Sequence, residues 1–212
     1  EPLPTIGDPE EALATGTTRI HAYGEGGNIH RLAHLAFGDV EDAFRQDGVR
    51  VFEDLFFYAG NTHLALEQHA AVAALDQDGR LTLWSSTQTP HYVHRELARA
   101  LAMPAHRIRV VACPNGGGFG GKSDPFNHEM VVAKAALLTG RPVKSALTRE
   151  EVFYAHRGRH PTLMRLKTGA LPDGTIVGMD LETLLDGGAY GSYGPASTLY
   201  TGQLQTVTYH VP

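Results

Sequence analysis

A run of glycines limits the fold of this chain more than any other feature. Residues 115–125 read NGGGFGGKSDP, and five of the six residues from 116 to 121 are glycine. Glycine loses more conformational freedom on folding than any other residue, so this run predicts a loop. Such glycine runs usually occur where backbone N–H groups must approach a ligand closely. The flanking sequence predicts a strand over 107–112 and a helix that begins near Pro125.

The same loop fits a second pattern, that of the nucleotide-binding P-loops. Residues 116–123 match G-x-x-x-x-G-K-[ST]. In this interpretation Lys122 and Ser123 would meet phosphate and magnesium, and Asp180, at the end of an apolar strand, would supply a magnesium-side carboxylate. However, Phe119 stands where a P-loop backbone would approach phosphate, and a proline follows two residues after the serine. A P-loop nucleotide-binding module therefore stays open as an alternative from another class of protein.

Strand and helix patterns are mixed along the chain. Two tight turns, at Asp78-Gly79 and Pro172-Asp173-Gly174, predict hairpins. Hairpins beside helices favour an α+β fold over a doubly wound parallel sheet. Helices are expected over residues 40–48, 90–103, 126–140 and 148–156, and extended segments or strands over 28–40, 49–60, 70–87, 106–113, 141–148, 163–185 and 206–211. Residues 187–198 predict a second glycine-rich loop.

The ends and the domain organisation can also be judged from sequence. Residues 1–27 predict a linker with one short helix that Asp8 caps, and residues 28–212 predict one domain. The chain begins with Glu1 and stops just after an expected strand. We therefore expect it to be a piece of a longer polypeptide, with residues 28–212 as the first part of a domain, so that some site residues lie further along the chain.

Charge and cysteine content exclude several function classes. The 212 residues carry a formal net charge of −5 and no basic run, which argues against nucleic-acid binding and against binding to an acidic membrane surface. The single cysteine, Cys113, rules out an internal disulfide, and no apolar run is long enough to span a membrane. These features predict a cytoplasmic protein. Twelve histidines are present, but none falls in a zinc-site spacing, so no side-chain metal ligand is expected.

Several further motifs accompany the glycine loop in a fixed order. They are SSTQTPHYVHRELARAL at 85–101, TGRPVKSALTREE at 139–151, GRHP at 158–161 and DGGAYGSYG at 186–194. Together with the loop they resemble the large subunit of the molybdenum hydroxylases, the xanthine dehydrogenase and aldehyde oxidase family. Within that family, TQTPHYVHRELARAL, SDPF and TREEVFYAHRGRHP look closest to the catalytic subunit of the 4-hydroxybenzoyl-CoA reductases.

The resemblance implies a molybdenum–molybdopterin cofactor that the protein holds without a direct side-chain ligand to the metal. It implies that the backbone of Gly116, Gly117, Gly118, Phe119, Gly120 and Gly121 binds this cofactor. Gln88 matches the glutamine that hydrogen-bonds the apical oxo ligand, for which a neutral NH₂ donor suits better than a carboxylate. Arg159 in GRHP is expected to order a loop near the cofactor. The general base of the family lies beyond residue 212, so no catalytic residue is assigned here.

Two differences from the purine-oxidising members of the family narrow the range of expected substrates. Ser123 stands where those members have a glutamate, and Tyr200 aligns with their arginine. The resemblance then implies a substrate site formed by Phe119, Ser123 and Tyr200, which suits a neutral aromatic ring better than a purine. The implied reaction is reductive dehydroxylation of 4-hydroxybenzoyl-CoA to benzoyl-CoA, and the alternative is hydroxylation of another aromatic compound or an aldehyde. Iron–sulfur and FAD-binding subunits are the implied partners, in a hetero-oligomer.

Overall fold

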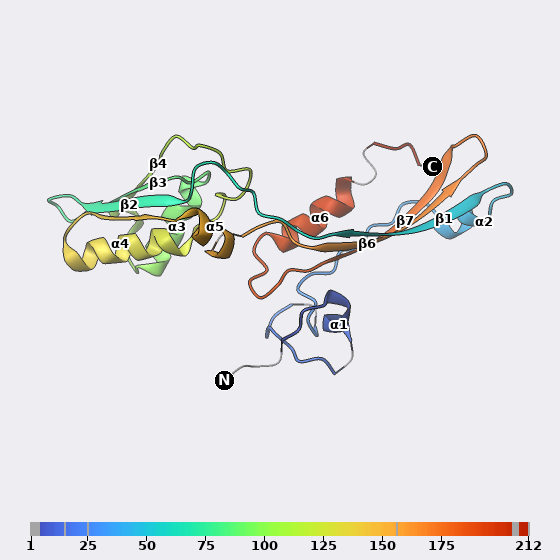
Figure 1. Cartoon of the computed structure of the whole chain (residues 1–212), viewed down its shortest axis with the longest axis horizontal. Helices are drawn as coiled ribbons and strands as arrows, with labels where there is room; N and C mark the ends of the chain where they lie inside the picture. The colour runs from blue at the N-terminus through green and yellow to red at the C-terminus, as the bar shows by residue number, and fades with distance from the viewer. Residues whose placement is uncertain (1–4, 15, 25, 156, 205–207, 212) are drawn as a thin grey trace. The chain divides into compact units, whose positions relative to one another are not determined.

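The computed structural model describes residues 5–14, 16–24, 26–155, 157–204 and 208–211. Its contacts divide the chain into two compact units (Figure 1). One unit is the continuous segment Thr62–Arg159, and the other combines Glu1–Asn61 with His160–Pro212. Each unit has its own sheet, and the two are described separately.

The continuous unit contains a mixed four-stranded sheet in the order β4-β3-β2-β5. Strands β2 (Ala70–Leu75) and β3 (Leu81–Ser85) form the expected hairpin, and Gly79 has the positive φ of 71° that its turn needs. Strand β4 (Ile108–Ala112) runs parallel to β3, and β5 (Val143–Ala146) runs antiparallel to β2. The sheet is therefore antiparallel except for the single parallel crossover from β3 to β4.

Two helices supply the other half of this unit's core (Figure 1). Helix α3 (Pro90–Ala100) connects β3 with β4, and α4 (Asn127–Thr139) follows the glycine loop and ends at Gly140, which has φ 65°. Alternate residues of β3 face this core, since Leu81 and Leu83 are fully buried while Trp84 is exposed. The core cluster also contains Val93, Leu97, Ile108, Val132, Ala133 and Ala136. A short 3-10 helix (Ala105–Arg107) and α5 (Arg149–Ala155) complete the unit.

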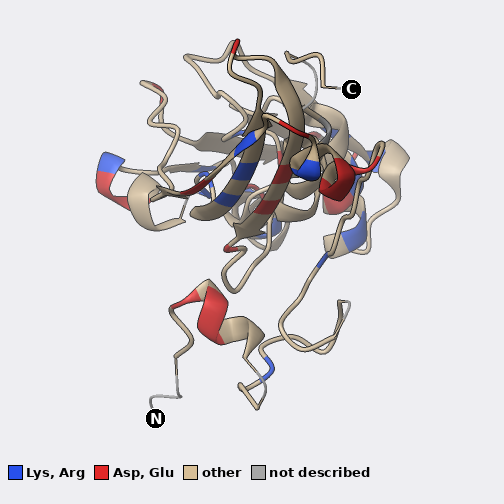
Figure 2. Cartoon of the chain, turned by 90° about the vertical axis from the view of Figure 1, so that its right-hand side faces the viewer, with Lys and Arg blue, Asp and Glu red and all other residues tan. Residues whose placement is uncertain are grey.

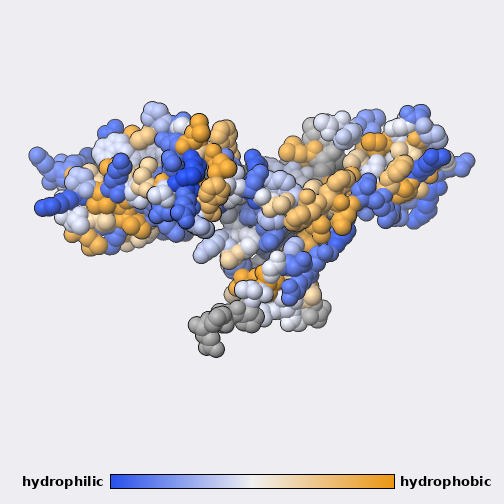
Figure 3. Space-filling model, in the orientation of Figure 1, coloured by the Kyte–Doolittle hydropathy of each residue, from blue (hydrophilic) through white to orange (hydrophobic). Residues whose placement is uncertain are grey.

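The other unit contains an antiparallel sheet in the order β1-β6-β7. Its strands are β1 (Arg50–Tyr58), β6 (Thr162–Ala170) and β7 (Ile176–Leu185), and the β6–β7 hairpin turns where Pro172-Asp173-Gly174 predicted it. Acidic and basic residues alternate across these strands (Figure 2), with Arg165 paired to Glu182. Every residue of the edge strand β1 is exposed, and its large apolar side chains contribute to the apolar surface of Figure 3.

The described residues of the same unit also form helices. They are α1 (Pro9–Leu13), α2 (Val40–Arg45) and α6 (Gly194–Leu204). As expected, the Asp8 side chain caps α1 by accepting the Glu10 and Glu11 N–H groups. Phe44 of α2 packs on β6 and β7 where Gly169 and Gly178 leave room, because a Cβ at Gly169 would lie 2.8 Å from the Phe44 ring.

The fold class expected from sequence is confirmed, because helices and antiparallel strands mix in both units. Three local predictions differ from the structure. Residues 28–40 form no strand beyond one isolated bridge at Ile29, and the second glycine-rich loop turns into α6 at Gly194. Of the expected strand over 206–211, residues 206 and 207 lie outside the described residues, and 208–211 are not in a strand. Among the described helices, none is long and apolar enough to cross a membrane.

Candidate functional site

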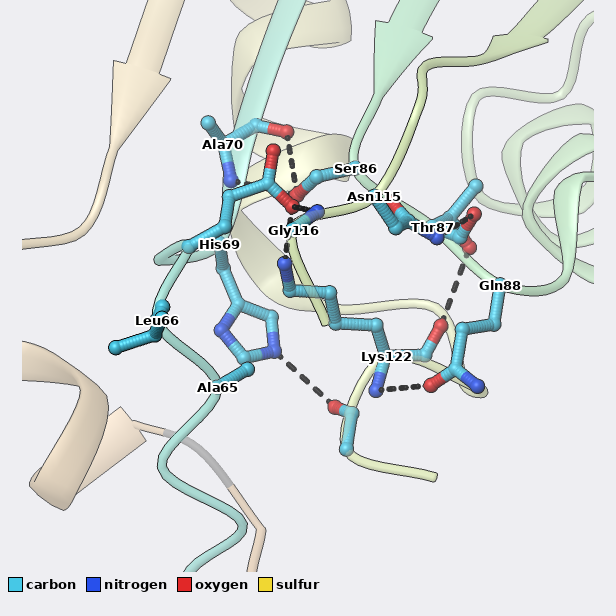
Figure 4. A network of polar contacts seen from close by, with 12 residues as sticks. Ala65, Leu66, His69, Ala70, Ser86, Thr87, Gln88, Asn115, Gly116 and Lys122 are labelled. Atoms are coloured by element: carbon cyan, nitrogen blue, oxygen red, sulfur yellow. Dashed lines mark hydrogen bonds and ion pairs between the residues drawn. The ribbon is translucent and has the colours of Figure 1, made fainter. Parts of the chain in front are cut away.

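The glycine loop connects β4 with α4 and is held against the segment that follows β3 (Figure 4). Asn115 donates to the Thr87 carbonyl at 3.1 Å, and the Thr89 hydroxyl donates to the Ser123 carbonyl at 3.0 Å. The buried His69 ring lies 3.1 Å from the Gly121 carbonyl. The loop therefore has a fixed conformation in which both of its ends are anchored by polar contacts.

Gln88 is the residue most closely tied to this loop (Figure 4). Its Oε1 accepts two backbone N–H groups, from Gly120 and from Lys122, each at 3.1 Å. Its own N–H donates to the Lys122 carbonyl at 2.8 Å. These contacts fix the orientation of the amide, because a reversed side chain would place its NH₂ against two donors. The Gln88 NH₂ has no partner among the described residues, so it is left as a donor.

Most of the glycines are required by the packing of the loop itself. A Cβ at Gly118 would lie 2.4 Å from the Gln88 Oε1, and a Cβ at Gly116 would lie 2.7 Å from the Glu67 Cβ. Gly117 and Gly120 have φ values of 101° and 91°, which side chains rarely adopt. The glycines thus allow Glu67 and Gln88 to approach the loop, a reason that the sequence alone did not reveal.

Three loop amides are left over after these contacts. The structure gives no acceptor among the described residues for the N–H groups of Gly117, Gly118 and Phe119. Phe119 itself is 69% exposed and has a φ of 54°, which is unusual for a residue with a side chain. A strained aromatic residue beside three unpaired donors is typical of a ligand-binding loop rather than of a simple turn.

Lys122 is not available as a phosphate ligand. It is 2% exposed, and its Nζ lies 2.5 Å from the Glu67 Oε2, which also accepts the Gly116 N–H at 2.9 Å. Burial acts to raise the pKa of Glu67, but the hydrogen bonds from Lys122 and Gly116 outweigh it and lower the pKa, so Glu67 is charged. Asp180, the other P-loop residue, lies in the antiparallel sheet of the other unit. The geometry therefore disfavours the P-loop interpretation.

Ser123 is held by an arginine that sequence analysis did not identify. Its hydroxyl donates to the Gly120 carbonyl at 2.6 Å and accepts a hydrogen bond from Arg157 at 2.9 Å. Arg157 also forms an ion pair with Asp124 and donates to the Gly120 carbonyl. Arg159, the residue expected to order the loop, is exposed. The sequence positions of Arg157 and Glu67 do not predict their contacts with the loop, because both residues reach the loop only through the tertiary fold.

Tyr200, the third residue of the expected substrate site, lies in α6 of the other unit. It is 51% exposed, and its ring lies 6.3 Å from that of Tyr193. Within the continuous unit the structure brings together the remaining site residues, namely Gln88, Gly116, Gly117, Gly118, Phe119, Gly120, Gly121 and Ser123.

A buried polar layer supports the loop from behind. Glu129 is 2% exposed and accepts the Ser85 hydroxyl at 2.5 Å and the Phe126 N–H at 2.8 Å. Burial raises the pKa of Glu129, although the two hydrogen bonds oppose this shift. Burial, with a smaller contribution from the nearby His69, lowers the pKa of His128 to about 4. Among the described residues, no group of three or more His, Cys, Asp or Glu could hold a metal ion.

The donor set fits an anionic cofactor held by hydrogen bonds rather than by metal coordination. Four donor groups have no partner among the described residues: the Gln88 NH₂ and the backbone N–H groups of Gly117, Gly118 and Phe119. Backbone N–H groups in such a loop form a nest for negative charge. A cofactor with oxygen and sulfur acceptors would find donors here without displacing any existing contact.

Comparison with known proteins agrees with this chemistry. The profile of the molybdopterin cofactor-binding domain matches residues 20–212. The chain is 41% identical over 196 residues to the nicotinate dehydrogenase large molybdopterin subunit of Eubacterium barkeri, which covers 92% of the chain and 45% of that protein. It is 36% identical to the xanthine dehydrogenase molybdenum-binding subunit of Escherichia coli, over 92% of the chain and 25% of that protein.

A solved structure is similar as well. The aldehyde oxidoreductase from Desulfovibrio gigas superposes with a TM-score of 0.82 and 28% identity, over 96% of the chain and 22% of that protein. The chain thus spans less than half the length of each of these relatives. The family profile nevertheless spans nearly the whole chain, and the chain belongs to the molybdopterin cofactor-binding domains of the xanthine dehydrogenase and aldehyde oxidoreductase family.

Proposed function

We propose that this chain binds a molybdenum–molybdopterin cofactor through Gln88 and the loop from Gly116 to Gly121, as part of a larger oxidoreductase. The observation that carries the proposal is the fixed amide of Gln88. Two loop N–H groups hold its Oε1 at 3.1 Å, which leaves its NH₂ as a donor, and the amides of Gly117, Gly118 and Phe119 in the same loop have no acceptor among the described residues.

Each of these groups has a role that its chemistry supports. The Gln88 NH₂ donates to an acceptor atom of the cofactor, and because the amide is neutral it does not repel an anionic group. The loop amides stabilise negative charge that grows as electrons are added, and being fixed in advance they need no reorganisation. When bound, the cofactor supplies two-electron redox chemistry. Iron–sulfur clusters and FAD in partner subunits or domains complete the proposed route for electrons.

The proposed substrate is an aromatic compound. Phe119 offers an exposed ring for offset or edge-on packing. The Ser123 hydroxyl donates its hydrogen bond to the Gly120 carbonyl and accepts one from Arg157, so one lone pair remains to accept a hydrogen bond from a substrate hydroxyl. Phe119, Ser123 and Tyr200 are all uncharged, so none of the three would fix the ring nitrogens of a purine through its charge.

Two reaction directions have separate support. The motif TREEVFYAHRGRHP and its neighbours favour reductive dehydroxylation of 4-hydroxybenzoyl-CoA, in which two electrons and two protons remove a hydroxyl group as water. The similarity to a nicotinate dehydrogenase subunit favours the opposite direction, hydroxylation of an aromatic acid, in which water supplies the oxygen and two electrons and two protons are released. We propose a cytoplasmic location for either reaction.

One assay separates these possibilities. The natively purified protein, with any subunits that co-purify, is offered nicotinate, an aromatic aldehyde and xanthine with an artificial electron acceptor, and 4-hydroxybenzoyl-CoA with a reduced viologen dye. Turnover of an aromatic acid, aldehyde or thioester with little turnover of xanthine is expected. Xanthine as the preferred substrate would contradict the proposed role of Ser123 and Tyr200.

A further inference from the structure

One carboxylate joins the two ends of the glycine loop. Glu67 Oε2 accepts the Gly116 N–H at 2.9 Å and the Lys122 ammonium at 2.5 Å, although these residues stand at opposite ends of the loop. The Glu67 N–H also donates to the Gly116 carbonyl at 3.3 Å. Glu67 therefore sets the distance between Gly116, the first residue of the loop, and Lys122, the residue that follows its last glycine.

The charge of Glu67 is needed because Lys122 is buried. The side chain of Lys122 is 1% exposed, whereas that of Glu67 is 33% exposed. A buried ammonium group is costly unless it is paired, so loss of the Glu67 charge would drive Lys122 towards solvent. Among the described residues, Glu67 is the one carboxylate paired with Lys122.

Movement of Lys122 would be transmitted directly to Gln88. The backbone of Lys122 is hydrogen-bonded to Gln88 in both directions, with the Lys122 N–H donating to Oε1 at 3.1 Å and the Gln88 N–H donating to the Lys122 carbonyl at 2.8 Å. At the other end of the loop, Gly116 precedes the three amides that lack acceptors among the described residues. The Gln88 side chain is thus one hydrogen bond away from Lys122, and the three loop amides follow Gly116 directly in the chain. Lys122 and Gly116 are the two residues that Glu67 binds.

We propose that Glu67, through its ion pair with Lys122 and its hydrogen bond with Gly116, is a positioning residue that holds the Gln88 amide and the loop N–H groups in the arrangement the cofactor requires. The part of this inference that concerns the cofactor rests on the proposed function. The part that concerns the arrangement of the loop does not. Glu67 acts through other residues: its described hydrogen bonds and its ion pair are all with Gly116 and Lys122 of the loop, and a weaker electrostatic interaction reaches His69.

The test compares three variants of the natively purified protein with its co-purifying subunits. Glu67→Gln keeps an acceptor for the Gly116 N–H but removes the charge that Lys122 needs. Glu67→Asp keeps the charge and withdraws it by about 1.5 Å, the length of one carbon–carbon bond. It serves as the second variant if Glu67→Gln does not fold. Glu150→Gln is the matched control, because Glu150 is an exposed carboxylate of α5 whose side chain has no described partner.

The first readout, amide hydrogen exchange, does not depend on the cofactor. The Gly120 and Lys122 N–H groups are protected by Gln88, so Glu67→Gln should speed their exchange by about tenfold or more, which is the effect of losing one charge-assisted hydrogen bond. Glu67→Asp should fall between the wild type and Glu67→Gln. Exchange at both amides that is unchanged in Glu67→Gln, or in Glu67→Asp if only that variant folds, would overturn the inference.

The second readout is electron paramagnetic resonance of the partly reduced molybdenum, with kinetics in parallel. Glu67→Gln should shift the spectrum and lower kcat by about tenfold, because donors to the cofactor move. Faster exchange with an unchanged spectrum in molybdenum-loaded protein would overturn the link to the cofactor. Absence of molybdenum from the wild type would instead overturn the proposed function, and the exchange result would still decide whether Glu67 arranges the loop.

Discussion

At the scale of single residues, the contact between Gly118 and Gln88 sets the shape of the site. A Cβ at Gly118 would lie 2.4 Å from the Gln88 Oε1 and 2.6 Å from its Cδ. Gly118→Ala should therefore displace the Gln88 side chain and leave two loop N–H groups without their acceptor. We expect the free energy of unfolding, measured with urea, to fall by about 1–3 kcal/mol.

Gly7→Ala provides the matched control for this substitution. A Cβ at Gly7 has no atom within 4 Å, and the residue does not have the positive φ that would strain an alanine. Its free energy of unfolding should stay within about 0.5 kcal/mol of the wild type. Equal stability of the two alanine variants would mean that Gln88 does not lie against Gly118.

A second residue, His128, makes stability depend on pH. Its ring nitrogen Nε2 is buried without a described partner, its ring lies 6.0 Å from that of His69, and burial lowers its pKa from 6.5 to about 4. A lowered pKa means that the unfolded chain binds the proton more tightly, so the stabilisation is present above pH 6.5 and is lost as the pH falls towards about 4.

His128→Phe should remove this dependence, because it keeps a ring and abolishes the titration. From about pH 7 to about pH 5, the wild type should lose about 2 kcal/mol more of its free energy of unfolding than the variant loses. Urea unfolding at the two pH values measures the difference. Parallel pH profiles for both proteins would show that His128 is not buried as a neutral ring.

At the scale of helices and strands, packing of α3 against the mixed sheet contributes to the stability of the continuous unit. Leu97 of α3 is fully buried, whereas Leu138 of α4 is 75% exposed. Leu97→Ala should lower the free energy of unfolding by about 2–5 kcal/mol, and Leu138→Ala, the same chemical change at the surface, by less than about 0.5 kcal/mol. Similar losses in urea unfolding for the two variants would contradict this packing.

Sequence predicted those elements whose signals are local. The Asp78-Gly79 turn and the Asp8 cap both lie where the pattern placed them. Helix α6 was missed because its sequence, GPASTLYTGQL, contains glycine, proline and β-branched threonine. Residues 28–40 were wrongly expected to form a strand, because an apolar pattern does not provide a pairing partner.

In the candidate site, too, the residues with local sequence motifs were predicted and the residues that depend on distant contacts were not. The glycine loop and Gln88 were recognisable from their motifs, and the structure shows them in contact. Glu67 and Arg157 were not recognisable from sequence, because the partners of Glu67 lie 49 or more residues away and those of Arg157 lie 33 or more residues away. Hydrogen bonds between residues so far apart in the chain do not produce a recognisable spacing in the sequence.

At the scale of the whole molecule, the continuous unit Thr62–Arg159 has the properties of an independent folding unit. Its core cluster lies entirely within that segment, from Ala71 to Val143. We expect residues 62–159, expressed alone, to unfold cooperatively in urea and to give a dispersed amide NMR spectrum. A non-cooperative transition with a collapsed spectrum would contradict the division of the chain into these two units.

The central claim is that the fixed Gln88 amide and the glycine loop bind a molybdenum–molybdopterin cofactor. The most direct test is the molybdenum and pterin content of the natively purified protein with its co-purifying subunits, measured by elemental analysis and by fluorescence of the oxidised pterin. The account predicts about one molybdenum and one pterin per chain. Natively purified, folded protein that contains neither would contradict it.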